Sequence, residues 1–498
     1  MPGKKKTNTK KKILFVASEA VPFAKTGGMG DVCGALPKVL KKMGHDVRLV
    51  LPRYWNINKS QHAPKKAVSP MGVQMGLGTV WCEVLEGELE GVPVYFIEHE
   101  GYFGRAGYYD DGIDEFFDNA ERFGFFCHAA LQLAKDIGFQ PDVVHCNDWQ
   151  TGLIPGYLKI KYLYDPFFAN TASVFTIHNI GYQGVFPMEF YPFMGLGAEN
   201  FTEPKFESYE KMHFMKGAIF YADNVTTVSD SYRDELLTPD GAKGLAPYLE
   251  RRRDDFYGIL NGADYDHWDP AKDKLIPANY SISDISGKSI CKRALQKEFL
   301  LKERTDIPVI GIITRFAEQK GFQHVAPIIR SIVNNMMVQF AIVGSGEKSQ
   351  EDFFGGLPAE YPGVIGTWIG YENRKAHLIE AGADFFLMPS LYEPCGLSQI
   401  YSMKYGTLPI VRSIGGLRDT VFNYDEATGS GTGFAFYSPD PISIYYTVGW
   451  AVSTYYDRPH HIAKLRMQAM HEDYTWEKAA KKYERVYDHA IARRNSWK

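Results

Sequence analysis

The sequence predicts an α/β protein built from two doubly wound parallel sheets. Short apolar runs alternate with helical patterns through most of the chain, as is typical of strands buried on both faces of a parallel sheet. This alternation breaks near the middle, where prolines and scattered charges dominate, and then restarts. The length of 498 residues also exceeds what one hydrophobic core usually serves. We therefore expect two domains.

The first half contains continuous apolar runs that read as strands. The expected strands are residues 13–18, 47–51, 142–146, 173–177, 224–228 and 256–260. Amphipathic patterns predict helices at residues 32–43 and 123–133. Residues 60–101 read as irregular with a short strand at 92–97, and residues 102–118, rich in Tyr, Phe, Gly and Asp, read as a surface loop.

The second half repeats the pattern. The expected strands are residues 308–314, 338–343, 383–388 and 408–411, and helices are expected at 397–405 and 476–492. The resulting division is a basic disordered leader (1–12), a first Rossmann-like domain (13–262), a linker (263–288), a second Rossmann-like domain (289–475) and a C-terminal helix (476–498) that can pack back on the first domain.

Composition narrows the function classes. Hydrophobic residues at 45% and charged residues at 23% are typical of a soluble globular protein. A net charge of −4 gives no general attraction to nucleic acid, and no apolar run approaches the roughly 20 residues of a membrane span. The six cysteines are scattered without a C-x-x-C pair, and the leader has no apolar core of a signal peptide. A cytoplasmic protein is expected.

Polar side chains follow the predicted strands in both halves. They are Lys25, Asp148, His178, Asn261, Arg315, Lys320 and Glu393. Because ligands of open α/β sheets bind outside the carboxyl ends of the strands, we expect these side chains to face one cleft between the two domains. Glu393 also precedes a helix start, which suits a phosphate or sugar hydroxyls. The loop at residues 25–28 (KTGG) matches neither the dinucleotide fingerprint nor the P-loop.

The residues alone leave several chemistries open. Three cations at strand ends could stabilise a diphosphate leaving group without a metal. Glu393 could instead form a glycosidase pair with Asp148. A metal site at residues 145–148 is disfavoured because side chains at that spacing on a strand end diverge. The D-x-D at residues 264–266 reads as a pair of turn carboxylates. No metal and no cofactor are expected.

With these motifs assembled, the chain resembles the bacterial glycogen synthase and plant starch synthase family of retaining glycosyltransferases (GT5). The matching segments run in family order at residues 25–28, 178–184, 225–229, 259–262, 315–321, 393–397, 415–417 and 419–421. The chain departs from the family pattern at Ala263, at Ile414 and at residues 146–149, where CNDW replaces the usual pattern ending in H-D-W. These departures bear on fine specificity.

The resemblance implies the GT-B architecture, ADP-glucose as donor and the non-reducing end of an α-1,4-glucan as acceptor. The first domain would be the acceptor side and the second the donor side. The residues it assigns to catalysis are Lys25, His178, Arg315, Lys320 and Glu393, with the three cations on the diphosphate. The further residues it assigns to ADP-glucose are Gly27, Gly28, Asp148, Asn179, Asn261, Tyr371 (adenine), Cys395, Gly396 and Leu397. We assign Asp31, Tyr109 and Tyr182 to the acceptor.

Three alternatives remain at this point. The same fold could use UDP-glucose, or the chain could be a glucan-binding protein, hydrolytic or with little or no transferase activity. A hydride-transferring enzyme is more distant, because neither half opens with G-x-G-x-x-G. The sequence gives no prediction of the oligomeric state and none of the choice between glycogen and starch as product.

Overall fold

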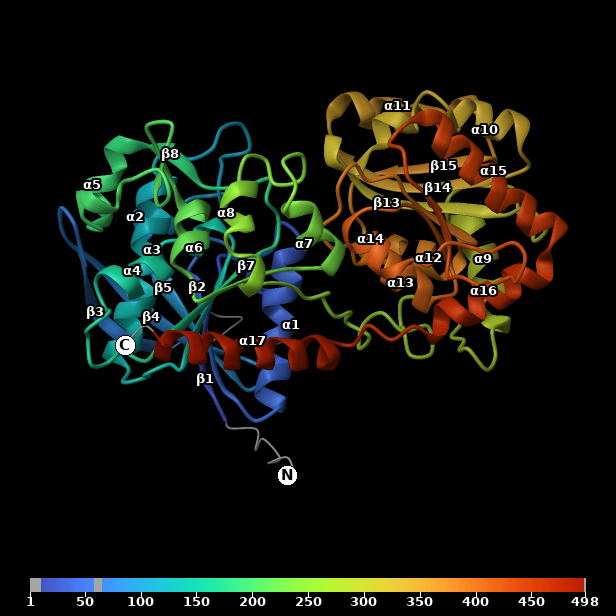
Figure 1. Ribbon diagram of the computed structural model, residues 1–498. Helices are drawn as coiled ribbons and strands as arrows, with labels where there is room; N and C mark the ends of the chain where they lie inside the picture. Colours follow the sequence, from blue (N-terminus) through green and yellow to red (C-terminus); the bar gives the residue numbers. More distant parts are fainter. Residues whose placement is uncertain (1–9, 58–64, 497–498) are drawn as a thin grey trace. The chain divides into compact units, whose positions relative to one another are not determined.

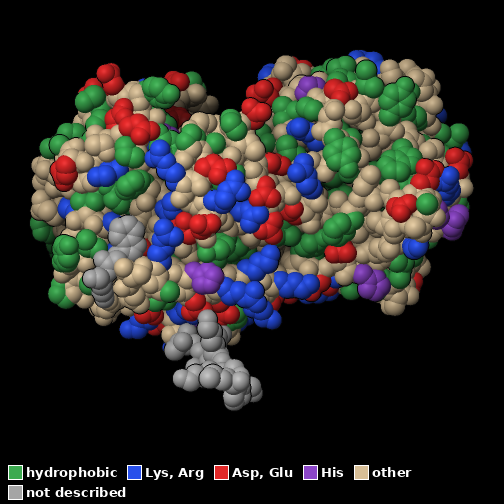
Figure 2. All heavy atoms as spheres, in the orientation of Figure 1, with side chains coloured by type: hydrophobic (Ala, Val, Ile, Leu, Met, Phe, Trp, Pro, Cys, Tyr) green, Lys and Arg blue, Asp and Glu red, His purple; other side chains and the backbone are tan. Residues whose placement is uncertain are grey.

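The computed structural model describes residues 10–57 and 65–496 (Figure 1). Most of the expected leader lies outside these residues. The chain forms two compact α/β units. The first contains the residues up to Val228, Arg233–Ile259 and the chain from Trp476 onward, and the second contains Ser229–Tyr232 and Leu260–Thr475. On the face shown in Figure 2, basic and acidic side chains are interspersed, in keeping with the small net charge. No helix in the described parts of the chain has the length and apolar character needed to cross a membrane.

The first unit is organised around one mainly parallel sheet with the strand order β12-β11-β7-β6-β1-β2-β5-β4-β3. Its strands are β1 (Lys12–Val16), β2 (Asp46–Pro52), β3 (Lys65–Met75), β4 (Gly78–Leu89), β5 (Val92–Glu98), β6 (Val143–Asn147), β7 (Ala172–Ile177), β11 (Asn224–Thr227) and β12 (Phe256–Gly258). The seven strands from β12 to β5 are parallel, and their positions confirm the strands expected from the apolar runs. Strands β8 (Val185–Pro187), β9 (Glu207–Ser208) and β10 (Lys211–His213) form a small antiparallel sheet.

The expectation of an irregular segment is wrong for residues 65–89, whereas the short strand expected at residues 92–97 is present as β5. Strands β3 and β4 form a long antiparallel hairpin that continues the sheet beyond β5. On β3, only Met71, Val73 and Met75 are buried, and the pairing with β4 shifts register between Val68 and Met71, around Pro70. An edge strand can carry a proline and exposed polar residues, so its alternation is short and its sequence signal is weak.

Helices cover the sheet of the first unit. They are α1 (Gly28–Lys42), α2 (Glu100–Phe103), α3 (Asn119–Asp136), α4 (Ile154–Ile160), α5 (Tyr191–Met194), α6 (Phe214–Tyr221), α7 (Asp230–Leu236, at the boundary of the two units), α8 (Ala246–Glu250) and α17 (Trp476–Ser496). Helices α1 and α17 pack against each other on the sheet, and α3 packs on β3 and β5. Residues 104–118 form turns between α2 and α3.

The C-terminal helix α17 is part of the first unit. Its Tyr487 hydroxyl lies 2.8 Å from Nδ1 of His145 on β6, and Asn224 Nδ2 donates to the Val486 carbonyl at 3.0 Å. Arg494 is buried and donates to the carbonyl of Leu158 at 3.2 Å. The last segment of the chain therefore closes the core formed by the first 259 residues.

The second unit contains a parallel sheet with the order β15-β14-β13-β16-β17-β18. Its strands are β13 (Val309–Phe316), β14 (Gln339–Gly346), β15 (Ile365–Ile369), β16 (Phe385–Met388), β17 (Leu408–Arg412) and β18 (Phe434–Phe436). Its helices are α9 (Ser286–Glu298), α10 (Ile329–Asn335), α11 (Lys348–Glu360), α12 (Asn373–Gly382), α13 (Ser398–Lys404), α14 (Gly415–Thr420), α15 (Pro441–Asp457) and α16 (Pro459–His471). The edge strands β15 and β18 were not expected. Strand β15 ends in exposed residues, and β18 has only three residues, so neither forms a long apolar run.

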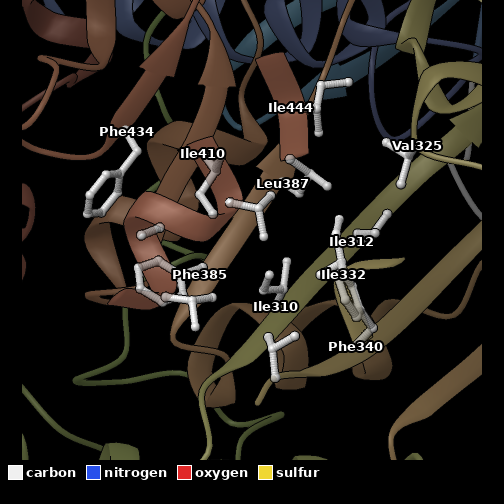
Figure 3. Close-up of a cluster of buried hydrophobic side chains, with 14 of the residues drawn as sticks. Ile310, Ile312, Val325, Ile332, Phe340, Phe385, Leu387, Ile410, Phe434 and Ile444 are labelled. Carbon is white, nitrogen blue, oxygen red and sulfur yellow. The ribbon is translucent and has the colours of Figure 1, made fainter. Parts of the chain in front are cut away.

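Both faces of this second sheet are buried. Ile310 and Ile312 on β13, together with Phe385 and Leu387 on β16, point into one cluster of apolar side chains (Figure 3). The alternate residues Val309, Phe386 and Met388 belong to another cluster. Successive residues of a strand point to opposite faces, so a strand buried on both faces must be apolar throughout. This is why these apolar runs could be recognised as strands from the sequence.

Residues 263–288, expected to be a linker, instead pack into the second unit. The Tyr405 hydroxyl donates to Asp273 Oδ2 at 2.6 Å, and His377 Nδ1 lies 2.7 Å from the same oxygen. The ring of Trp268 stacks on His377 with centroids 3.7 Å apart, and Tyr280 is buried. Buried polar and aromatic anchors therefore hold a segment that has almost no regular secondary structure.

Candidate active site

Glu393 stands at the carboxyl end of β16 with one oxygen already engaged. Lys320 Nζ donates to Glu393 Oε2 at 2.7 Å, and the buried Ser390 hydroxyl donates to the same oxygen at 3.0 Å. Glu393 is 6% exposed, and its Oε1 accepts no hydrogen bond from the described residues. The carboxylate is thus fixed in position and has an acceptor oxygen available for hydroxyl groups.

The loop that carries Lys320 is fixed against the residues after β16. Gly321 has a φ of +75°, and a Cβ there would overlap the carbonyl oxygen of Pro389. The Leu391 N–H donates to the Gln319 carbonyl at 2.8 Å. Only glycine allows this left-handed conformation and this close approach at once. The backbone of the loop therefore determines where the Lys320 ammonium lies relative to Glu393.

The turn after Glu393 depends on the glycines that begin α14. The Gly416 N–H donates to the Glu393 carbonyl at 3.0 Å, and a Cβ on Gly416 would overlap the Cys395 carbonyl. Gly396 has a φ of +72°, and Leu397 is the N-cap of α13. Burial raises the pKa of the Cys395 thiol to about 12, so Cys395 packs the turn and is not a thiolate nucleophile.

Asn261 lies beside Cys395 with an unsatisfied polar atom. Its backbone and side chain act to lower the pKa of the Cys395 thiol, against the larger effect of burial, and Asn261 is 6% exposed. Its buried Oδ1 has no hydrogen-bond partner among the described residues. A buried acceptor without a partner is unfavourable, so this oxygen is suited to a donor group of a ligand such as a sugar hydroxyl.

Two further predicted residues of the second unit are solvent-exposed. Arg315 lies near the end of β13. This strand extends two residues beyond its predicted end at residue 314, so Arg315 belongs to the strand itself. Its guanidinium forms no ion pair or hydrogen bond with the part of the chain that the structure describes. Tyr371, after β15, is 69% exposed, and its hydroxyl donates to Asn373 Oδ1 at 3.1 Å. Both side chains are free to contact a ligand.

In the first unit, the loop at residues 25–28 leads directly into α1. No side chain caps the start of this helix, and a Cβ on Gly27 or Gly28 would meet no atom within 4 Å. Uncapped N–H groups beside open space suit a phosphate. Lys25 Nζ donates to Asp31 Oδ1 at 2.7 Å, so Asp31 is the counter-ion of Lys25 in this structure.

Glu19 fixes this loop, and sequence reasoning missed it. The Thr26 backbone N–H and hydroxyl donate to its two carboxylate oxygens at 2.5 and 2.7 Å. The Tyr109 hydroxyl donates to Glu19 Oε1 at 2.6 Å, and burial raises the pKa of Tyr109 well above its usual value. Glu19 follows β1, and this position after a strand was the available signal. Tyr182, in contrast, is largely exposed.

Asp148 follows β6 in a strained backbone conformation. Its φ is +55° with ψ at −177°, a region that residues other than glycine rarely occupy. The carboxylate Oδ1 accepts from the His178 N–H at 2.7 Å and from the Asn179 N–H at 3.4 Å. Burial raises the pKa of Asp148 to about 7, against the lowering effect of these two N–H groups. Such strain in a buried carboxylate is typical of a functional position.

The imidazole of His178 is buried, neutral and fixed by Asn147. His178 Nε2 lies 2.9 Å from Asn147 Oδ1, and Asn147 Nδ2 donates to the Val16 carbonyl at 3.0 Å. An amide oxygen only accepts, so Nε2 carries the hydrogen and Nδ1 is the lone pair. Burial lowers the pKa of His178 to about 3. Asn179 Oδ1 accepts from the Gly181 N–H at 2.8 Å, which makes a local turn.

The structure therefore brings the predicted residues together within each unit. Asp148, His178 and Asn179 meet at the strand ends of the first, and Asn261, Lys320, Glu393 and the 395–397 turn meet in the second. Asp264 Oδ1 accepts from the Asp266 N–H at 3.0 Å, as the turn interpretation predicts. Within residues 10–57 and 65–496, no group of three or more His, Cys, Asp and Glu side chains is arranged to hold a metal ion.

Known proteins are similar to this chain over nearly its whole length. The family model for the starch synthase catalytic domain matches residues 12–251, and that for glycosyl transferases group 1 matches residues 296–462. Glycogen synthase 1 of Geobacter metallireducens is 46% identical over 488 residues, 97% of this chain and 97% of that protein. Glycogen synthase of Geobacillus thermodenitrificans is 42% identical over 484 residues, 96% and 98% of the two chains.

A solved structure agrees with these sequence matches. The catalytic domain of starch synthase IV from Arabidopsis thaliana, bound to ADP and acarbose, superposes with a TM-score of 0.89 at 31% identity. The match covers 97% of this chain and 100% of that domain.

Proposed function

The chain belongs to the glycogen and starch synthase family of GT-B glucosyltransferases, and we propose that it transfers glucose from ADP-glucose to the non-reducing end of an α-1,4-glucan. The expected configuration of the product is the retained one. The relatives at 42–46% identity are glycogen synthases, and the structural neighbour was solved with ADP. These similarities support the donor and the acceptor chosen here.

The Lys320–Glu393 pair is the observation that carries the proposal for the donor. A nucleoside diphosphate leaving group gains negative charge as the bond to glucose breaks, and a fixed cation stabilises that charge. Lys320 lies 2.7 Å from a carboxylate whose second oxygen is available for glucose hydroxyls. The guanidinium of Arg315, which has no partner among the described residues, supplies a second cation at the end of the same sheet. We assign the diphosphate to these two cations and the glucose to Glu393 and Asn261.

The first unit contributes groups that suit the same substrate. The open backbone at Gly27 and Gly28 and the side chain of Lys25 are assigned to the phosphates. The neutral His178 is assigned to a glucose hydroxyl through its Nδ1 lone pair, and Asp148 holds the residues around it. A neutral imidazole suits this role because a pKa of about 3 keeps the acceptor nitrogen unprotonated near neutral pH.

The test is nucleotide release from ADP-glucose and from UDP-glucose, each with and without glycogen and in the presence of EDTA. We expect ADP release that requires glycogen and persists in EDTA. Replacing Lys320 with alanine should lower kcat for ADP-glucose about 100-fold, since it removes a cation from the developing charge. Lys348→Ala is the matched control, because Lys348 is an exposed lysine paired with Asp352 on α11.

Two outcomes would contradict the proposal. Equal use of UDP-glucose would leave the transferase chemistry in place and overturn the choice of donor. Binding of glycogen without release of either nucleotide would favour a glucan-binding protein on this scaffold. The direct readout is the nucleotide released per enzyme per second, with the wild type and the Lys348→Ala control measured side by side.

We also infer a cytoplasmic location. All six cysteines are free and buried, which suits a reducing compartment. Fractionation of cells that express the chain from its own promoter, followed by immunodetection, tests this location directly.

A further inference from the structure

Helix α15 of the second unit is uncharged on every side. Its sequence has no Asp, Glu, Lys, Arg or His between Pro441 and Tyr456. One face packs on β17, β18 and α16, where Ile444, Val448 and Val452 are buried. A helix at the surface of a protein normally carries charged residues on its outer face, and a helix that is apolar all round is normally covered on both sides. The described residues leave the outer face of α15 open.

The exposed residues of α15 form one straight stripe. Ile442 is 67% exposed, Tyr446 is 70% exposed and Tyr456 is 40% exposed. With Gly449 and Ser453 they follow one another at intervals of four, three, four and three residues. This is the spacing of the seam along which two helices pack in a coiled coil. In Figure 2, hydrophobic side chains gather over the part of the second unit in which Figure 1 places α15.

Two methionines lie beside this stripe. Met337 is 58% exposed, and its carbonyl accepts from the Tyr456 hydroxyl at 2.8 Å. A Cβ on Gly449 would lie 3.1 Å from the methyl group of Met336, which can move aside. Glycine within a helix is unfavourable relative to alanine, and the described residues do not require it at this position. A second helix packed closely against the stripe would account for the glycine.

The stripe is symmetric about its centre. Ile442 and Tyr456 each lie seven residues from Gly449, and Tyr446 and Ser453 lie three and four residues from it. In an antiparallel pair of these helices with a two-fold axis at Gly449, Ile442 of one copy meets Tyr456 of the other. Tyr446 of one copy then meets Ser453 of the other, so a bulky side chain faces a small one. Two-fold dimers need such a self-complementary surface, and an uncharged face brings no like charges together.

We propose that a second copy of this chain covers α15, in a dimer whose two α15 helices pack antiparallel across Gly449. Four large side chains of the face, Ile442, Tyr446, Tyr456 and Met337, are 40–70% exposed. At roughly 150–250 Å² for each fully covered side chain, they can bury about 500 Å² per copy. Specific interfaces begin at about 600 Å² per copy, a value that the flanking residues bring within reach. We therefore expect a weak dimer, with a dissociation constant of about 1–100 μM.

The experiment is sedimentation velocity over about 1–100 μM protein. The wild type should change from the chain mass of 56.3 kDa to twice that mass as its concentration rises. Ile442→Glu and Tyr446→Glu each bury an unpaired carboxylate in the dimer, so each should raise the dissociation constant at least about tenfold. Ile290→Glu is the matched control for Ile442→Glu, because Ile290 is 43% exposed on helix α9 of the same unit. The control should dimerise like the wild type.

Oxidative cross-linking tests the two-fold arrangement itself. With the axis at Gly449, the two copies of Gly449→Cys face each other and can form a disulfide. The two copies of Ser453→Cys lie about 12 Å apart along the helices, beyond the roughly 7 Å between Cα atoms that a disulfide can span. All six native cysteines are buried, so they should not compete. In mild oxidant, Gly449→Cys should give at least about tenfold more covalent dimer than Ser453→Cys on a non-reducing gel.

Three results would overturn the proposal. They are a wild type that stays at the monomer mass at about 100 μM, glutamate variants that dimerise as strongly as Ile290→Glu, and equal cross-linking of the two cysteine variants. If a monomeric wild type co-sedimented with phosphatidylcholine vesicles, the face of α15 would instead be assigned to a lipid surface. None of these measurements uses nucleotide release, so the proposed function stands or falls separately.

Discussion

Replacing Asp148 with asparagine should change the stability of the first unit in a way that depends on pH. Burial raises the pKa of this carboxyl from an ordinary 3.8 to about 7. Folding therefore favours the protonated form. The stability that this proton contributes is fully present below about pH 3.8 and is lost as the pH rises through 7. Asparagine cannot ionise, so the wild type should lose stability relative to Asp148→Asn as the pH rises.

The size of the effect follows from the two pKa values. The pKa of Asp148 is 3.8 in the unfolded chain and about 7 in the folded one. Proton linkage then lowers the free energy of unfolding of the wild type by roughly 2 kcal/mol between pH 5.5 and pH 8.5. For a unit of about 280 residues, this corresponds to roughly 4–8 °C in Tm. The backbone N–H groups of His178 and Asn179 can still donate to the amide oxygen of asparagine, so the fold of the turn should be retained.

The assay is thermal unfolding of wild type and Asp148→Asn at pH 5.5 and at pH 8.5. The quantity of interest is the Tm of the variant minus the Tm of the wild type at each pH. This difference removes the contribution of groups that titrate equally in both proteins. Asp240→Asn, at an exposed position, controls for the loss of one negative charge. The reasoning is refuted if the Tm difference for Asp148→Asn is the same at both pH values, or if it changes in the opposite direction.

Three further predictions follow from the geometry. Glu393→Gln should lower kcat at least about 100-fold, because the carboxylate charge facing glucose is lost. The affinity for ADP should stay within about threefold, because the amide oxygen can still accept from Lys320, which is assigned to the diphosphate. Initial rates and calorimetry measure the two effects, and equal losses in both would contradict the assigned role. Gly321→Ala should lower Tm and reduce the free energy of unfolding by about 1–3 kcal/mol, because the residue has a positive φ and a Cβ there would overlap the Pro389 carbonyl oxygen. Gly356→Ala, at an open helical position, should be neutral or stabilising. Similar Tm values for the two variants would be inconsistent with this reasoning. Asn147→Asp should raise the pKa of His178 from about 3 by about 1–3 pH units, because a carboxylate beside the ring favours the charged imidazolium. On acidification, the variant should therefore lose activity at a higher pH than the wild type. An unchanged acid limb of the pH–kcat profile would disprove the role of Asn147.

The strands that position the site could be predicted because both of their faces are buried. Ile310, Phe385 and their neighbours form unbroken apolar runs, and the functional side chains follow directly after such runs. The hairpin of β3 and β4 and the edge strands β15 and β18 escaped prediction, because edge strands need not be apolar on both faces. A pattern read from single strands therefore identifies the centre of a sheet better than its edges.

Residue roles that depend on a partner far away in the chain were not readable. Asn147 was visible only as a departure from the family pattern, and its bond to His178 spans 31 positions. Glu19 was not singled out, although it holds Thr26 and Tyr109. Asp31 was assigned to the acceptor, and in the structure its carboxylate accepts a hydrogen bond from Lys25. Local sequence indicates which side chain stands at a strand end. Its tautomer, its counter-ion and its supporting contacts are set by tertiary structure.

The helix α17 has a consequence for the order in which the chain folds during synthesis. The ribosome must complete residues 260–475, which form nearly all of the second unit, before α17 emerges. Until then His145 lacks Tyr487, and the Val486 carbonyl is not yet available to Asn224. The unit that begins first is thus finished last, while the second unit can fold as one stretch of chain. A nascent chain released at residue 475 should expose the apolar surface that α17 covers and should be the form that chaperones retain.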